Sequence, residues 1–144
     1  MRIVVDSNIV FSALLNSAST IGELLFNSEE QFTFSAPNYL KEEIEKHWKK
    51  LLKISKLSEE ELRNAQLSVY KRIRFFDEHE IHEKVWKTTE DILKDIDLDD
   101  TAFIALAKHL RATLWSGDKA LVLGLRKAGF TKVVTTTELI SLKE

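Results

Sequence analysis

The stretch RIVVDSN, residues 2–8, joins a short apolar segment to three polar residues. Residues 2–5 are rich in β-branched side chains and show no helical period, which predicts a buried strand. Asp6, Ser7 and Asn8 follow directly and have the chemistry of a turn and a helix cap. Because open parallel sheets bind ligands at the carboxyl ends of their strands, Asp6 is the first candidate for a functional residue.

Strand-like and helix-like segments alternate along the rest of the chain. Further strands are expected at residues 31–36, 74–76, 113–115 and 132–135. Helices are expected at residues 9–15, 21–27, 37–53, 59–73, 82–93, 100–111, 118–127 and 137–142. This alternation predicts an α/β fold of three layers (α/β/α), with a central, mostly parallel sheet of four to five strands flanked by helices.

The composition predicts a single domain that spans residues 1–144, with a helical elaboration at about 38–95 on one side of the sheet. The absence of cysteine excludes disulfides, zinc–thiolate sites and cysteine nucleophiles, so we expect a cytoplasmic protein. No apolar run approaches the roughly 20 residues that span a bilayer, and we expect no membrane partner. Because the formal net charge is only −2, any binding of nucleic acid must come from local patches or from metal ions.

Three more acids lie beside apolar runs, as Asp6 does. Glu43 lies in a helical stretch, Asp100 precedes the run at 103–107, and Asp118 follows the strand expected at 113–115. Acids in such places are costly unless they are paired or bound to metal. Several converging carboxylates suit a hard divalent cation such as Mg²⁺ or Mn²⁺.

Each acid also has a simpler interpretation. Asp6, Asp100 and Asp118 could cap the helices that follow them, and Glu43 could lie on a solvated helix face. The segment DIDLDD at 95–100, however, holds four acids where one cap needs one or two. Asp97 and Asp100 would share a helix face if that helix begins early, so Asp97 joins the candidate ligands.

Crowded carboxylates without metal repel one another, and at least one of their pKa values should rise. One or two cations would relieve this repulsion, polarise a phosphate and lower the pKa of a bound water, which then becomes the nucleophile. The acids therefore predict metal-assisted phosphodiester hydrolysis without a protein nucleophile.

The chain resembles the PIN-domain nucleases from residue 1 to about residue 142. The resemblance rests on VVDSNIV with SALL (4–10, 12–15), SAP through Glu43 and Ile44 (35–44), DLDD with FIALA (97–100, 103–107), and WSGDKAL (115–121). Ser116 stands where threonine is commoner in the family.

The resemblance implies a ribonuclease that depends on Mg²⁺ or Mn²⁺. It assigns the acidic quartet to Asp6, Glu43, Asp100 and Asp118, and an additional acid to Asp97. It also implies that Asn8 and Ser116 orient the first and the last acid. Many single-domain prokaryotic members resemble VapC-type toxins, which form homodimers and are inhibited by a small antitoxin.

Two basic runs offer a second possible contact with nucleic acid. They are Lys49, Lys50, Lys53 and Lys56, and Lys71, Arg72 and Arg74, interleaved with Trp48, Tyr70, Phe75 and Phe76. Such runs can hold phosphates and stack bases, but we favour a solvated helix face with aromatic side chains in the core. The four histidines show no metal-ligand spacing and are interpreted as surface residues.

Other classes of protein fit less well. A haloacid-dehalogenase-type phosphatase needs an aspartate where Asn8 stands, and a response-regulator receiver needs an acidic pair before the first strand's aspartate. A non-catalytic PIN-like module that binds RNA or joins an assembly remains an alternative. The sequence does not distinguish a toxin from a housekeeping nuclease, or an endonuclease from an exonuclease.

Overall fold

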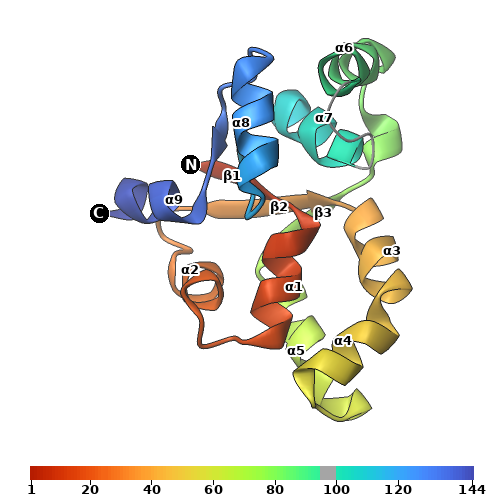
Figure 1. Cartoon of the computed structure of the whole chain (residues 1–144), viewed down its shortest axis with the longest axis vertical. Coiled ribbons are helices and arrows are strands. Elements are labelled where there is room, and N and C mark those ends of the chain that lie inside the picture. Colours follow the sequence, from red (N-terminus) through yellow and green to blue (C-terminus); the bar gives the residue numbers. More distant parts are fainter. Residues whose placement is uncertain (95–99) are drawn as a thin grey trace.

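The structure is a computed structural model that describes residues 1–94 and 100–144. Its centre is a parallel sheet of five strands in the order β3-β2-β1-β4-β5. The strands are β1 (Arg2–Val5), β2 (Thr33–Pro37), β3 (Ile73–Phe76), β4 (Thr113–Trp115) and β5 (Val133–Val134). Helices lie above and below the sheet in Figure 1, which confirms the predicted α/β fold.

Most helices lie where the sequence pattern predicts them. They are α1 (Ser7–Leu15), α2 (Thr20–Asn27), α3 (Tyr39–Lys46), α4 (Trp48–Ser55), α5 (Glu59–Tyr70), α6 (Glu83–Leu93), α7 (Thr101–Leu110), α8 (Lys119–Lys127) and α9 (Thr136–Lys143), with the short 3-10 helix η1 (Glu78–Glu80). A capping box at Ser58 and Glu61 begins α5, and a second one at Thr135 and Glu138 begins α9. Each box supplies acceptors for N–H groups that have no partner within the helix.

The register of the central strands fixes the geometry of the sheet's carboxyl edge. Strand β1 lies between β2 and β4, and Val5 is paired with Trp115. Both side chains are fully buried, as are Ile3, Val4 and Leu114, so the core covers both faces of β1. One residue further along, the Asp6 N–H donates to the Trp115 carbonyl at 3.3 Å. The residues that follow β1 and β4 are therefore held side by side.

The structure corrects the prediction of one helix over residues 37–53. Pro37 is the last residue of β2, where its missing N–H costs the ladder little, and the helix begins at Tyr39. The helix is then interrupted at His47, which separates α3 from α4. The ring of His47 lies edge-on against Phe11, with the ring centroids 5.7 Å apart, so the break coincides with a contact to α1. Ile73, expected at the end of a helix, belongs to β3.

Within the described ranges, no single helix is both long and apolar enough to cross a membrane. Helices α1 and α2 reach the required length and composition only as a pair that is bent by 102°. Both helices contribute buried side chains to the core.

Candidate active site

Asp6 is a buried carboxylate at the carboxyl end of β1. Its side chain is the N-cap of α1, and Oδ1 accepts a hydrogen bond from the Ile9 N–H at 3.0 Å. Only 3% of the residue is exposed. Burial raises the pKa of Asp6 from 3.8 to about 6, and repulsion by Asp118 adds to the rise, while hydrogen bonds from Ser116, Ile9 and Asn8 oppose it. The predicted rise in a carboxyl pKa is therefore present, with burial as its main cause and repulsion as a smaller one.

Asp118 follows β4, the strand next to β1, and lies two residues after Ser116. It is the N-cap of α8, and its Oδ1 accepts from the Leu121 N–H at 3.1 Å. Asp118 is exposed, whereas Asp6 is buried, so the pair has one carboxylate open to solvent and one closed off from it. The simpler interpretation of both acids as helix caps is thus correct in geometry, but capping occupies only Oδ1 of each carboxylate.

Ser116 joins these two acids. Its hydroxyl oxygen accepts a hydrogen bond from the Asp118 N–H at 3.0 Å, and its side chain also hydrogen-bonds to the Asp6 carboxylate. A hydroxyl can donate one hydrogen bond while it accepts another, so Ser116 donates to Asp6. Ser116 is 1% exposed and follows the buried Trp115, and the sheet therefore fixes its position.

Glu43 reaches the same edge of the sheet from α3. Its Oε1 accepts a 2.7 Å hydrogen bond from the hydroxyl of Ser7, the residue after Asp6. Glu43 is half-buried and Ser7 is buried, so this glutamate does not lie on a fully solvated helix face. The sequence pattern indicated only turn or cap chemistry for Ser7, although its place beside Asp6 is a signal that could have identified its role in the site.

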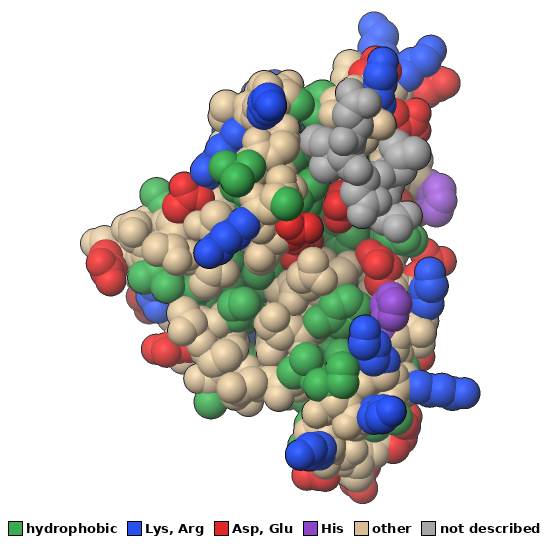
Figure 2. All heavy atoms as spheres, in the orientation of Figure 1, with side chains coloured by type: hydrophobic (Ala, Val, Ile, Leu, Met, Phe, Trp, Pro, Cys, Tyr) green, Lys and Arg blue, Asp and Glu red, His purple; other side chains and the backbone are tan. Residues whose placement is uncertain are grey.

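The other residues predicted for the site differ in their burial and in their hydrogen bonds. Asp100 is half-buried at the N-cap position of α7, and its side chain makes no capping hydrogen bond. Asn8 is exposed, and the hydrogen bond that it gives Asp6 comes from its backbone N–H. Asp97 lies outside the described residues. Figure 2 shows acidic side chains gathered in the middle of one face.

Glu78 is a further buried acid, which was not predicted from the sequence. It follows β3 in η1 and is 8% exposed, and its Oε2 accepts from the Tyr39 N–H at 3.4 Å. Tyr39 begins α3, and the N-cap residue Asn38 supplies no side-chain hydrogen bond. Glu78 therefore takes the place of a cap for the helix that carries Glu43. An acid two residues past a predicted strand end was the available signal.

The donor chemistry of these residues fits a hard divalent cation. All candidate ligands are carboxylates, and a cation beside Asp6 would offset the burial cost that raises its pKa. Within residues 1–94 and 100–144, no three His, Cys, Asp or Glu side chains are arranged closely enough to hold a metal. The described structure thus has the Asp6–Asp118 pair, with Glu43 attached to the same edge through Ser7.

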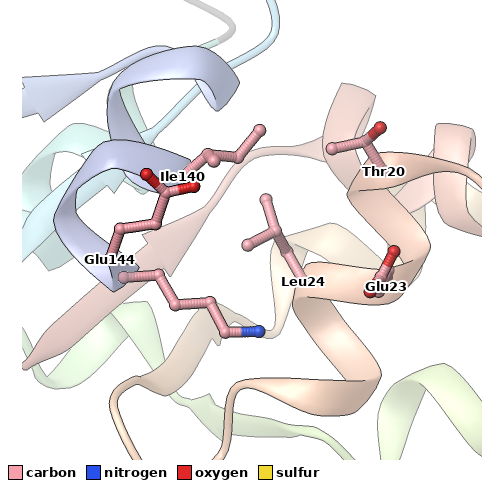
Figure 3. A pocket seen from close by; sticks show the side chains of 6 residues that line it. Thr20, Glu23, Leu24, Ile140 and Glu144 are labelled. Carbon is pink, nitrogen blue, oxygen red and sulfur yellow. The ribbon is translucent and has the colours of Figure 1, made fainter.

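A separate pocket of about 350 Å³ lies between α2 and α9. Figure 3 shows Thr20, Glu23 and Leu24 facing Ile140 and Glu144 across it. Figure 1 places α2 and α9 on the side of the molecule away from α3 and α7, so this pocket does not belong to the acidic site.

The parallel sheet and the acids at its carboxyl edge define an α/β protein with a carboxylate-lined site. The chain belongs to the PIN-domain family, whose model matches residues 4–142. Its fold is similar to that of a chain in the crystal structure of VapBC2 from Rickettsia felis bound to a DNA fragment from their promoter. The two share 14% identity with a TM-score of 0.68, over 94% of this chain and 97% of that chain. No curated protein sequence matches the chain.

Proposed function

We propose that this protein is a divalent-metal-dependent ribonuclease that acts as the toxin of a toxin–antitoxin pair. The observation that supports the proposal best is the Asp6–Ser116–Asp118 arrangement. It keeps a buried carboxylate, with its pKa raised to about 6, beside a second acid at the carboxyl end of the central strands. Such an arrangement destabilises the metal-free protein and suits a cation.

In this proposal Asp6, Glu43, Asp100 and Asp118 hold Mg²⁺ or Mn²⁺, with Asp97 as an additional ligand. The cation, when bound, supplies phosphate polarisation and an acidified water. Ser116 fixes Asp6 relative to Asp118, and Ser7 orients Glu43 through its 2.7 Å hydrogen bond. The Ile9 and Leu121 N–H groups each engage one oxygen of a carboxylate and thereby limit its rotation.

The toxin assignment is supported by membership of the PIN-domain family, whose members are generally nucleases, and by the fold shared with a chain of VapBC2. A small antitoxin is accordingly the proposed partner, and a homodimer in the cytoplasm is the proposed state.

A non-catalytic PIN-like module that binds RNA or joins an assembly is the second candidate. It is favoured by one observation: Asp6 and Asp118 both cap helices, a role that needs no metal. The two candidates differ in whether the protein cuts RNA.

The test is cleavage of mixed-sequence single-stranded RNA with Mn²⁺ or Mg²⁺, beside an EDTA control. Asp6→Asn is the informative variant, because asparagine also accepts a capping hydrogen bond but carries no charge. Asp91→Asn, at an exposed position on α6, is the matched control. We expect metal-dependent cutting by wild type and Asp91→Asn, and none by Asp6→Asn. RNA binding by folded wild-type protein without cutting would support the non-catalytic module.

A further inference from the structure

A groove of about 360 Å³ lies between α1 and α4. Its lining combines apolar, aromatic, amide and cationic side chains, including Asn8, Phe11, His47, Lys50 and Ile54. Phe11 and His47 are half-buried, and Ile54 is 52% exposed. This groove therefore presents ring and aliphatic surface to solvent next to an amide and an ammonium group.

The groove is connected to the acidic site along both of its walls. On one wall, Phe11 lies one helical turn after Ser7 in α1. On the other, His47 lies one turn after Glu43, and its N–H donates to the Glu43 carbonyl at 3.1 Å. The Ser7–Glu43 hydrogen bond and the Phe11–His47 ring contact are thus successive contacts between the same two walls. One turn is about 5 Å, so the rings lie within reach of a residue next to a phosphate held at the acids.

The charge of this region is opposite to that of the acidic site. Residues 46–56 contain five lysines and no acid. Figure 2 shows Lys or Arg side chains around a hydrophobic patch on this part of the surface, with a histidine beside them. Lys49, Lys50 and Lys53 are exposed, and none takes part in a salt bridge with another described residue.

Trp48 and two arginines are occupied by structural contacts. Arg63 lies over the Trp48 ring and pairs with Glu45, and Arg72 pairs with Glu29. The interpretation of a core aromatic therefore holds for Trp48, which is buried and donates its indole N–H to Glu59. The lysines beside the groove have no such role.

We propose that the α1–α4 groove binds the nucleotides of single-stranded RNA that flank the phosphate at the acidic site. The inference rests on the proposed function. A base stacks on Phe11 and His47, Asn8 contacts a base edge, and Lys50 contacts a backbone phosphate. Aromatic stacking next to a cationic rim is how proteins hold single strands with little sequence preference. An apolar protein segment would use Ile54 and its neighbours but would not need the run of lysines without acids.

The test measures binding of a short fluorescein-labelled single-stranded RNA to the full chain in EDTA, as a function of salt. Phe11→Leu removes the ring but keeps apolar bulk, and Lys50→Gln removes one charge at an exposed position. Lys87→Gln on α6 is the control, because α6 and α4 lie at opposite ends of the molecule in Figure 1. Circular dichroism establishes that each variant is folded.

The two groove variants should change RNA binding in different ways. Phe11→Leu should weaken binding by about five-fold or more with an unchanged salt dependence. Lys50→Gln should reduce the slope of log K against log salt by about 0.7, and Lys87→Gln should change neither quantity. RNA containing 5-iodouridine should photo-crosslink to Phe11 or His47.

The groove assignment and the nuclease proposal can fail separately. Wild-type affinity and salt slope in both groove variants would overturn the groove assignment, as would crosslinks found only elsewhere. That result would leave the groove to an apolar protein segment, even if the protein cuts RNA with Mn²⁺. Groove-dependent binding without any cleavage would keep the groove assignment and overturn the nuclease proposal.

Discussion

The Ser7 hydroxyl donates a 2.7 Å hydrogen bond to Oε1 of Glu43, which lies 36 residues further along the chain. This bond connects the first turn of α1, directly after Asp6, to the middle of α3. It orients a candidate ligand that lies within a helix and not at the end of a strand. Residues that orient ligands in this way typically change metal affinity or activity by about 10–100-fold when they are removed.

Ser7→Ala should therefore lower metal-dependent RNA cleavage by about ten-fold or more without unfolding the protein. The variant leaves Glu43 without its donor and adds no bulk. Cleavage rates at several Mn²⁺ concentrations would show whether the loss is recovered at high metal, as expected for a ligand that has lost its orientation. Ser68→Ala, at an exposed position on α5, is the control. Equal rates for Ser7→Ala and Ser68→Ala would contradict the role of Ser7.

Asp6→Asn should stabilise the metal-free protein at neutral pH. The pKa of Asp6 is raised from 3.8 to about 6 in the folded state, so the folded state binds more protons than the unfolded state between these values. The contribution of Asp6 to the free energy of unfolding therefore falls as the pH rises through that window. The total fall is about 3 kcal/mol for the pKa shift from 3.8 to about 6. Asparagine removes this loss while it keeps the helix cap.

Urea denaturation in EDTA at pH values from about 4 to about 7 would measure the effect. The difference in stability between Asp6→Asn and wild type should grow with pH up to the folded pKa and then remain constant. Asp91→Asn should follow wild type throughout. A difference that does not vary with pH would show that Asp6 does not carry the raised pKa.

Ser116→Thr should retain activity, whereas Ser116→Ala should lose about ten-fold or more. Threonine keeps the hydroxyl that accepts from the Asp118 N–H and donates to Asp6, and alanine removes it. The Ser116 hydrogen bond opposes the rise in the pKa of Asp6, so its loss should move the pKa of Asp6 still higher. The acid limb of the pH–rate profile of Ser116→Ala should accordingly move to higher pH. A limb that does not move would contradict the bond to Asp6.

Glu78→Ala should lower the free energy of unfolding by about 1 kcal/mol, and Glu78→Gln by less. Glutamine keeps an oxygen that can accept from the Tyr39 N–H, whereas alanine removes the acceptor that Glu78 supplies at the start of α3. Chemical denaturation would measure both changes, with the exposed Glu80→Ala as the control. A destabilisation of Glu78→Ala no larger than that of Glu80→Ala would show that Glu78 does not anchor α3.

The sequence predicted those parts of the fold and the site that depend on local pattern. The β-branched run before Asp6 identified a strand, and Val4 and Val5 are fully buried in it. Because parallel strands end at one edge, the residues after β1 and β4 were expected to lie close together. The bonds of Ser116 to both acids follow from that arrangement.

The sequence did not predict contacts between elements that are far apart in the chain. The break at His47 accompanies a ring contact with Phe11, and the role of Ser7 depends on how α1 packs on α3. No periodicity encodes either contact. The same holds for Glu78, whose partner Tyr39 is 39 residues earlier. The predicted roles of Asp97 and of the Asn8 side chain stay predictions.

The proposed function requires that the acids at the carboxyl edge of the sheet form a divalent-metal centre. Isothermal titration of Mn²⁺ into the metal-free wild type, Asp6→Asn, Asp118→Asn and Asp91→Asn would measure binding at this centre. We predict binding by wild type and Asp91→Asn, and at least ten-fold weaker binding by Asp6→Asn and Asp118→Asn, consistent with the loss of a charged ligand. Equal Mn²⁺ affinity in all four proteins, or no binding by folded wild type, would contradict the claim.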